Sequence, residues 1–238
     1  MIYSRDYHLE MEDFVAGGKM SLYGIMKNLE NTGYKHSESV GDGVFYGHEL
    51  NQAWVSIDWL LQIDEYPTCG QKIVMDTWSQ PCTSAAVAAR DFILSADGKV
   101  VVRATTRCAL VDLKEGRPMR MSKEILEKYQ PEDKKSIDIK RLERLEVPQE
   151  FDYEKEILLR RNDFDYNGHI HNLNYLPLAL EALNDEDYSK PINTLRISYK
   201  SAIKAGTKSL TCKCKKIQDR QFIFMYTEGE LRCIVVLN

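Results

Sequence analysis

The strongest constraint on the fold is that one order of predicted elements occurs twice along the 238 residues. Each half contains a short strand, a helix and then four strands, of which the last two form a hairpin. Asp97-Gly98 and Glu228-Gly229 are the hairpin turns, because such turns need residues that tolerate a positive φ. The strands expected are 7–12, 53–64, 71–79, 86–94 and 99–113 in the first half, and 153–160, 194–201, 208–217, 221–226 and 231–237 in the second.

Apolar residues at helical spacing predict one helix in each half, from Leu22 to Gly33 and from about residue 175 to Leu183. Pro177 is tolerable only in the first turn of the second helix. An antiparallel sheet must cover one apolar face, and the helix of each half supplies that cover. We therefore expect an α+β fold with two antiparallel sheets, each wrapped around a long helix.

This repeat divides the chain into residues 1–122, a connector at residues 123–150, and residues 151–238. The connector is rich in charge and carries Pro131 and Pro148. Such a composition is typical of an exposed linker, and a short helix is expected near residues 123–130.

The composition excludes several classes of protein. Hydrophobic residues make up 43% and charged residues 29%, which is ordinary for a globular chain. No apolar run approaches the ~18 residues of a membrane-spanning helix, and the charged first 14 residues do not resemble a signal peptide. The six cysteines form no CxxC pair, which favours free thiols in a reducing compartment and hence a cytoplasmic protein.

The net charge of −4 hides an asymmetry. From Lys190 to Asn238, ten basic residues stand against three acidic ones, giving this tail +7 and leaving −11 for the remainder. A basic tail on an acidic body attracts an acidic partner, either nucleic acid or an acidic carrier protein. The alternative is that these lysines only occupy the solvent face of strands.

Polar residues gather in one segment, residues 160–175, between a predicted strand and a predicted helix. The segment contains two of the five histidines, His169 and His171, and the carboxylates Asp163 and Asp165. Loops between rigid elements often carry catalytic groups. The start of the helix adds unpaired backbone N–H groups, which suit an oxyanion.

Residue types alone leave three interpretations of this segment open. In the first, Asp165 activates water while Asn167 and His169 orient and polarise a carbonyl, which is acyl-transfer hydrolysis without a covalent intermediate. In the second, the spacing of the histidines and carboxylates binds a metal. In the third, Asn, Asp and Gly are there only because they tolerate tight turns.

The same segment resembles a known family signature. Asp165, Asn167, His169 and Asn172, followed by Tyr175 and Glu181, are similar to the Asp-x-Asn-x-His-Val-Asn-Asn, Tyr and Glu positions of the acyl-acyl carrier protein thioesterases of plants and bacteria. The similarity extends over residues 5–237 and includes the strand that begins at Trp54. This family has the tandem, or double, hotdog fold, which agrees with the repeat.

The resemblance implies hydrolysis of the thioester of fatty acyl-acyl carrier protein, which releases free fatty acid and ends fatty acid synthesis. Asp165, Asn167 and His169 take the catalytic positions, and Asn172 and Trp54 are candidate substrate-binding residues. Glu181 matches a helix acid that is structural. The N-terminal hotdog shapes the acyl-chain cavity. Neither a cofactor nor a metal is expected.

One departure from the family pattern concerns the strand after the second helix. The family has Glu there, often followed by Cys, whereas this chain has Ala202 and Ile203. Loss of a glutamate that activates water would slow hydrolysis or leave it to Asp165 alone. The absent Cys also argues against a Cys–His mechanism at this position.

Two further functions stay open beside the acyl carrier protein thioesterase: an acyl-CoA thioesterase, and a non-catalytic hotdog protein that binds acyl chains. The expected partner is the acidic acyl carrier protein, with Lys213, Lys215 and Lys216 as docking residues, and not nucleic acid or a membrane. A tandem hotdog contains its own helix pairing, so both a monomer and a homodimer are consistent with the sequence.

Overall fold

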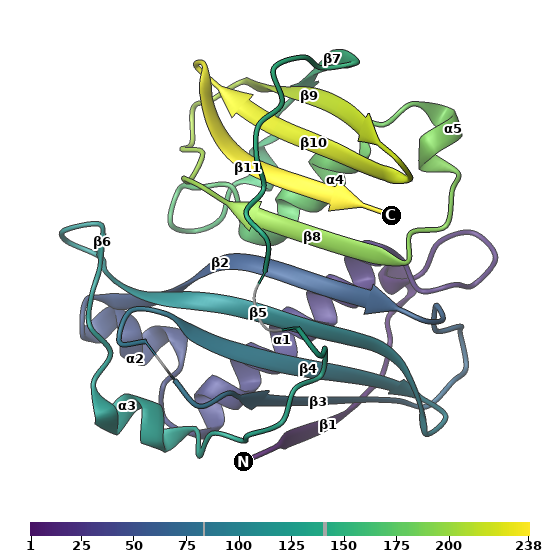
Figure 1. Ribbon diagram of the computed structural model, residues 1–238. Coiled ribbons are helices and arrows are strands. Elements are labelled where there is room, and N and C mark those ends of the chain that lie inside the picture. Colours follow the sequence, from purple (N-terminus) through teal and green to yellow (C-terminus); the bar gives the residue numbers. More distant parts are fainter. Residues whose placement is uncertain (83, 140–141) are drawn as a thin grey trace. The chain divides into compact units, whose positions relative to one another are not determined.

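The computed structural model describes residues 1–82, 84–139 and 142–238. The chain forms two compact units, Met1–Asp138 and Ile139–Asn238. Each unit contains one antiparallel sheet with a helical segment on one face (Figure 1).

The first sheet has the strand order β1-β3-β4-β5-β2, with the short β6 on β5, and all pairs are antiparallel. Four strands match the expected positions to within two residues. The bounds are β1 Tyr3–Tyr7, β2 Gln52–Ile63, β3 Ile73–Ser79, β4 Ala88–Ala96, β5 Lys99–Asp112 and β6 Arg117–Pro118. The first strand was predicted at residues 7–12 and instead ends at Tyr7, because Met11–Asp13 forms a 3₁₀ turn closed by the Asp13 carboxylate on the Glu10 N–H.

Helix α1 (Leu22–Ser39) packs on this sheet through its buried apolar residues, among them Ile25 and Leu29. Ser21 caps it by accepting a hydrogen bond from the Gly24 N–H at 2.8 Å. Each fully buried aliphatic side chain contributes about 1.5–3 kcal/mol. The prediction that Gly33 ends the helix is wrong: a Cβ at this position would lie 3.3 Å from the Phe92 ring, so the glycine permits close approach of helix and sheet.

Most described residues of the connector are exposed or half-buried, as its charge predicts, but part of the connector packs on the first sheet. It contains α3 (Lys123–Lys128), which confirms the short helix, but Tyr129 and Ile137 are buried. Beyond α3 the chain follows the first sheet, where the Trp78 indole N–H donates to the Lys134 carbonyl at 2.8 Å. The Ser136 N–H donates to the Asp91 carboxylate at 3.0 Å. The short helix α2 (Val44–Glu49) precedes β2.

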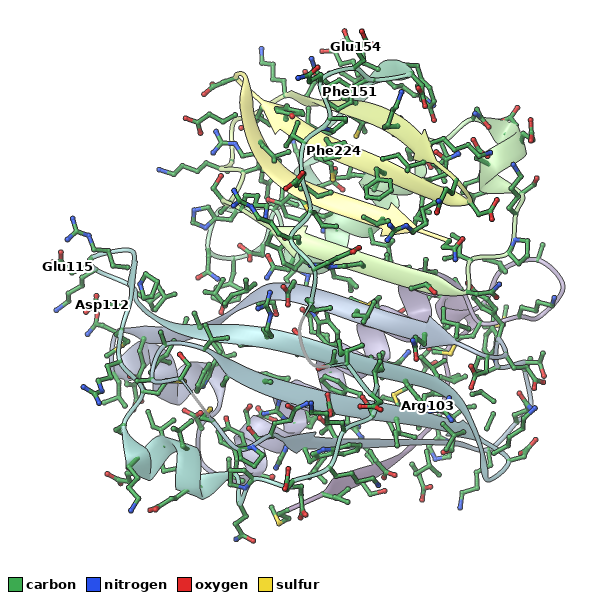
Figure 2. All side chains as sticks on the ribbon, in the orientation of Figure 1. Arg103, Asp112, Glu115, Phe151, Glu154 and Phe224 are labelled. Carbon is green, nitrogen blue, oxygen red and sulfur yellow. The ribbon has the colours of Figure 1, made fainter. Side chains whose placement is uncertain are left out.

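The second sheet has the order β8-β11-β10-β9-β7 and is also antiparallel. One face carries an apolar cluster on β10 and β11. Phe151, the first residue after the connector, packs against Phe224 of this cluster with the ring centroids 5.5 Å apart (Figure 2). The bounds are β7 Tyr153–Leu158, β8 Thr194–Tyr199, β9 Ser209–Ile217, β10 Arg220–Thr227 and β11 Glu230–Leu237.

The helical segment of the second unit is shorter than predicted. A 3₁₀ turn at Asn172–Asn174 leads into α4 (Tyr175–Leu180), so the start near residue 175 is confirmed. After Leu180 the hydrogen bonds tighten to three-residue spacing, with the Leu183 N–H on the Leu180 carbonyl. Asn184 then caps a separate short helix, α5 (Asp185–Tyr188), and this cap ends the longer helix implied by the leucine spacing.

Within the described ranges, no helix is long and apolar enough to span a membrane. In the same residues, no group of three or more His, Cys, Asp or Glu side chains is placed to hold a metal ion. All six cysteines are free, and Cys212, Cys214 and Cys233 are buried.

Candidate functional site

The predicted site residues lie on a closed turn of the second unit, between β7 and α4. Phe164 and Ile170 pair as an antiparallel bridge at the base of this turn. Above the bridge, the Asp165 N–H donates to the His169 carbonyl at 2.7 Å. Gly168 has a φ of 72°, which a glycine adopts without strain. The turn therefore brings Asp165, Asn167 and His169 together as the sequence predicted.

The Asp165 carboxylate helps to hold the turn. Its Oδ1 accepts hydrogen bonds from the backbone N–H groups of Asn167, at 2.8 Å, and His169, at 3.2 Å. These two bonds fix the position of the carboxylate on the turn. The second oxygen, Oδ2, accepts no hydrogen bond from the described residues and can bind another partner.

Asn167 and His169 present their side chains differently. Asn167 is exposed, whereas His169 and Asp165 are half-buried. No hydrogen bond of the Asn167 amide or of the His169 imidazole is formed with the described part of the chain. Both polar groups are thus available to a ligand.

Asp163 directly precedes the turn, holds it in place and is almost fully buried. Its carboxylate pairs with the Arg160 guanidinium at 2.8 Å. Its carbonyl accepts hydrogen bonds from the His171 N–H at 3.2 Å and from the Asn174 amide at 3.0 Å. This network fixes the turn to the beginning of the helical segment.

A second loop, residues 200–208, lies alongside the turn. His169 and Lys204 form a backbone bridge, and the Ile170 N–H donates to the Ile203 carbonyl at 2.9 Å. The buried Tyr175 hydroxyl accepts a hydrogen bond from the Ile203 N–H at 3.2 Å. Ala202, which stands where the family has glutamate, is exposed on this loop.

Sequence reasoning assigned no role to the two tyrosines that support this arrangement. Tyr175 was identified only as part of the signature, and burial raises its pKa, so its hydroxyl stays protonated. The Tyr199 hydroxyl donates to the Asn172 carbonyl at 2.9 Å. Their signal in the sequence is an aromatic residue with a polar tip at the start of a helix and at the end of a strand.

The remaining predicted residues do not join this turn. Trp54 belongs to the first unit, where its indole N–H donates to the Asp42 carboxylate at 2.7 Å and its ring packs against Ala88, Leu110 and Met121. These contacts account for Trp54 as a packing residue. Glu181 is exposed, and its carbonyl accepts a hydrogen bond from Lys155.

The first unit contains the same turn without an aspartate, an asparagine or a histidine. Phe14 and Met20 form the bridge, and the Val15 N–H donates to the Lys19 carbonyl at 2.9 Å, as Asp165 does to His169. Val15 and Lys19 thus occupy the places of Asp165 and His169, and Gly17 that of Asn167. Because the turn closes with valine, backbone geometry alone does not explain Asp165. The interpretation of this segment as only a turn is weakened.

Two antiparallel sheets in one chain, each with a helical segment on one face, define a double hotdog protein. Family models describe the same division: residues 1–129 match the acyl-ACP thioesterase N-terminal domain, and residues 146–230 match the C-terminal domain. The chain belongs to the acyl-ACP thioesterase family.

Individual relatives are distant in sequence and similar in fold. The chain is 26% identical over 178 residues to a chloroplastic acyl-[acyl-carrier-protein] hydrolase of Cuphea viscosissima, covering 70% of this chain and 43% of the relative. It is 27% identical over 180 residues to the chloroplastic oleoyl-acyl carrier protein thioesterase 1 of Arabidopsis thaliana, covering 68% and 49%. The chain thus spans less than half the length of these plant relatives.

Solved structures support the fold over nearly the whole chain. A crystal structure of an acyl-ACP thioesterase from Bacteroides thetaiotaomicron matches with a TM-score of 0.87 at 20% identity, covering 99% of this chain and 96% of that one. The 12:0-ACP thioesterase from Umbellularia californica matches with a TM-score of 0.86 at 18% identity, covering 100% and 96%. At these identities the likeness shows the double hotdog fold.

Proposed function

We propose that this protein hydrolyses the thioester of fatty acyl-acyl carrier protein and releases the free fatty acid. The observation that carries the proposal is the closed turn of the second unit, which presents Asp165, Asn167 and His169 together. Family membership and the names of the relatives support the choice of substrate. The first unit, which closes the same turn with Val15 and Lys19, is assigned the acyl chain.

The groups at the turn suit attack by water on a carbonyl. Asp165 Oδ2 and the His169 imidazole are the two groups able to accept a proton from water. The Asn167 amide positions water or the thioester oxygen. Water adds to the carbonyl carbon, the C–S bond then breaks, and the thiolate leaves with a proton to give the free carrier thiol and a carboxylate.

The developing oxyanion needs hydrogen-bond donors. The backbone N–H groups of Asn172 and Leu173 begin the helical segment directly after the turn, and among the described residues neither has an acceptor. First N–H groups of a helical segment are left unpaired by its geometry. They are our candidate donors for the oxyanion.

The proposal is tested by incubating the purified protein with acyl-acyl carrier protein and measuring the release of the free carrier thiol. We expect turnover in the wild type and a loss of kcat/KM of at least about 100-fold in Asp165→Asn and in His169→Ala. Lys19→Ala is the matched control, because Lys19 occupies the place of His169 in the turn of the first unit. It should retain wild-type turnover.

Other outcomes distinguish the remaining functions. Tight binding of the acyl carrier without turnover by the wild type contradicts hydrolysis and indicates an acyl-binding protein, the function favoured by Ala202. A higher kcat/KM on acyl-CoA than on the carrier-bound thioester indicates an acyl-CoA thioesterase. Equal loss of turnover in Lys19→Ala would contradict the assignment of the site to the second unit.

A further inference from the structure

The ten basic residues of the tail divide into two groups by their partners. Seven lie within 2.7 to 3.9 Å of a carboxylate of the second unit: Lys190, Arg196, Lys213, Lys215, Lys216, Arg220 and Arg232. The other three, Lys200, Lys204 and Lys208, have no carboxylate at ion-pair distance among the described residues. Only three of the ten positive charges of the tail therefore lack a neighbouring carboxylate among the described residues.

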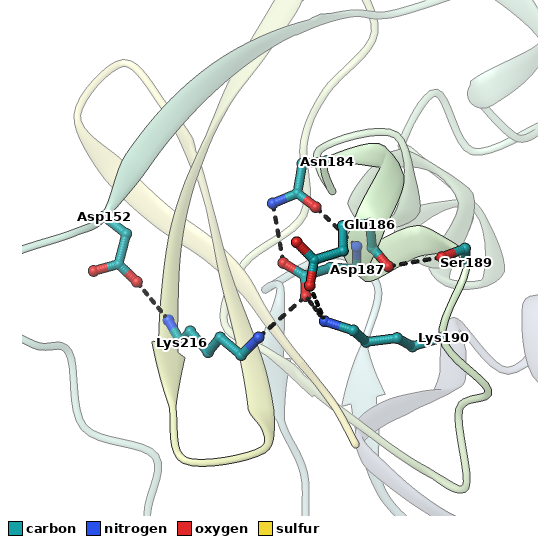
Figure 3. A network of polar contacts seen from close by, with 7 residues as sticks. All are labelled: Asp152, Asn184, Glu186, Asp187, Ser189, Lys190 and Lys216. Carbon is teal, nitrogen blue, oxygen red and sulfur yellow. Dashed lines mark hydrogen bonds and ion pairs between the residues drawn. The ribbon is translucent and has the colours of Figure 1, made fainter.

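The lysines of β9 are held by the acidic residues around them. The Lys215 ammonium is 2.7 Å from the Asp152 carboxylate. Lys216 donates its backbone N–H to Asp152 at 2.7 Å and lies 3.3 Å from Asp187 through its ammonium, and Asp187 also pairs with Lys190 (Figure 3). Lys213 is 3.5 Å from Glu154. These are the lysines that the sequence suggested for docking.

The three unpaired lysines all lie on the loop beside the candidate site. This loop, residues 200–208, connects β8 to β9. It lies at the same end of the second sheet as the turn that contains His169. Lys204 is bridged through its backbone to His169, and all three side chains are exposed. Lys200 makes a hydrogen bond of 3.0 Å to the Ser198 hydroxyl.

Another unpaired cation and two exposed apolar side chains lie at this end of the sheet. Arg161, in the segment that leads into the turn, is exposed and pairs with no carboxylate in the described ranges. Its neighbour Arg160 is neutralised by Asp163. Leu158 and Tyr166 are 74% and 75% exposed, which adds apolar surface next to the cations.

Pairing decides which charges act at a distance. A lysine next to a carboxylate forms a dipole whose field falls off steeply, whereas an unpaired ammonium acts over the Debye length, about 10 Å at 0.1 M salt. Unpaired cations steer an acidic partner and set the orientation in which it arrives.

We infer that Lys200, Lys204 and Lys208, with Arg161, form the docking edge for an acidic carrier protein, and that the β9 lysines do not. This inference rests on the proposed function for the identity of the partner. Docking at this edge brings the arm of the carrier to the loop that is bridged to His169.

Two triple variants with equal changes in net charge test the inference. One is Lys200→Gln, Lys204→Gln and Lys208→Gln, and the other is Lys213→Gln, Lys215→Gln and Lys216→Gln. The measurement is the Kd of the full chain for a bacterial holo-acyl carrier protein at low salt and at 0.5 M salt. Circular dichroism confirms that both variants are folded.

We expect the first triple to raise Kd roughly ten-fold at low salt, and the second to change it less than about two-fold. The difference should vanish at 0.5 M salt. Equal weakening by both triples, or greater weakening by the β9 triple, would overturn the inference. The thiol-release assay is independent: binding that depends on loop 200–208 without any hydrolysis would refute the proposed function and leave the docking edge intact.

Discussion

At the scale of single residues, the proposed hydrolysis depends on Asp165 and is expected to be slowed by Ala202. One carboxylate oxygen of Asp165 accepts hydrogen bonds from two backbone N–H groups, and the other accepts none from the described residues. Ala202 offers no polar atom where the family has a glutamate, although its backbone is held between Tyr199 at the end of β8 and the buried Ile203. The backbone of this loop is thus fixed, whereas position 202 carries no polar side chain.

Restoring the acid should therefore raise activity. Ala202→Glu places a second carboxylate on the exposed loop beside the turn, where it can accept a proton from water. We expect kcat on acyl-acyl carrier protein to rise about ten-fold, less than the roughly 100-fold or more that a fully positioned general base contributes, because Asp165 and His169 already offer proton acceptors. Ala205→Glu is the control, since it adds the same charge to the same loop at an exposed position. Equal changes in kcat in both variants would attribute the effect to charge alone.

At the scale of elements, the last turns of α1 show burial overriding the helix dipole. His36 lies near the C-terminus of α1, where the dipole favours a cation by up to about 2 kcal/mol. Burial, helped by the Arg90 guanidinium and the N-terminal amine, instead lowers the pKa of His36 from 6.5 to about 3. A shift of one pKa unit corresponds to about 1.4 kcal/mol, so the cost of burying the charged imidazole exceeds the favourable energy of the helix dipole. Arg90 donates to Nδ1 at 2.7 Å, and Nε2 has no partner among the described residues.

This histidine makes stability depend on pH. Below pH 6.5 the unfolded chain binds a proton at His36 that the folded chain does not bind until about pH 3. Its contribution is thus complete above pH 6.5 and is lost as the pH falls, by up to about 1.4 kcal/mol per pH unit. Urea unfolding of wild type and His36→Gln between pH 5 and 7 checks this. The slope should decrease in His36→Gln and persist in His8→Gln, which alters an exposed histidine; an unchanged slope in His36→Gln would contradict the prediction.

Local pattern predicted most strands but failed where tertiary contacts decide. The alternation of Lys and Cys in β9 predicts one solvent-exposed and one buried face. The burial of Cys212 and Cys214 confirms this prediction. Gly33 was misjudged because its role is contact with Phe92, which lies far away in sequence. The grouping of Asp165, Asn167 and His169 on one turn was predictable because they lie close together in sequence, and their catalytic roles stay a prediction. Tyr175 and Tyr199 were missed as supports because their partners, Ile203 and Asn172, are distant in sequence.

At the scale of the whole molecule, the free thiols report on packing. Cys69 is exposed, whereas Cys212, Cys214 and Cys233 are buried, and burial raises the pKa of each of these three thiols. Thiolates are the reactive form. In native protein at pH 8, iodoacetamide should modify Cys69 first, and the three buried thiols should react only as the second unit unfolds.

Mass spectrometry of peptides after timed labelling checks this, and six modified cysteines in denaturant provide the reference. Modification of Cys212 or Cys214 at the rate of Cys69 would show that the second sheet opens without global unfolding.

The turn that both units share has an evolutionary consequence. Where one loop geometry is built twice in a single polypeptide, the two copies are free to diverge, because mutation of one leaves the other untouched. Val15, Gly17 and Lys19 keep the geometry without the chemistry. A protein assembled from two identical subunits cannot differ in this way, since each change appears in both loops. Two copies of the turn in one polypeptide thus permit an asymmetric molecule, in which one loop bears the proposed site and selection is free to reshape the other.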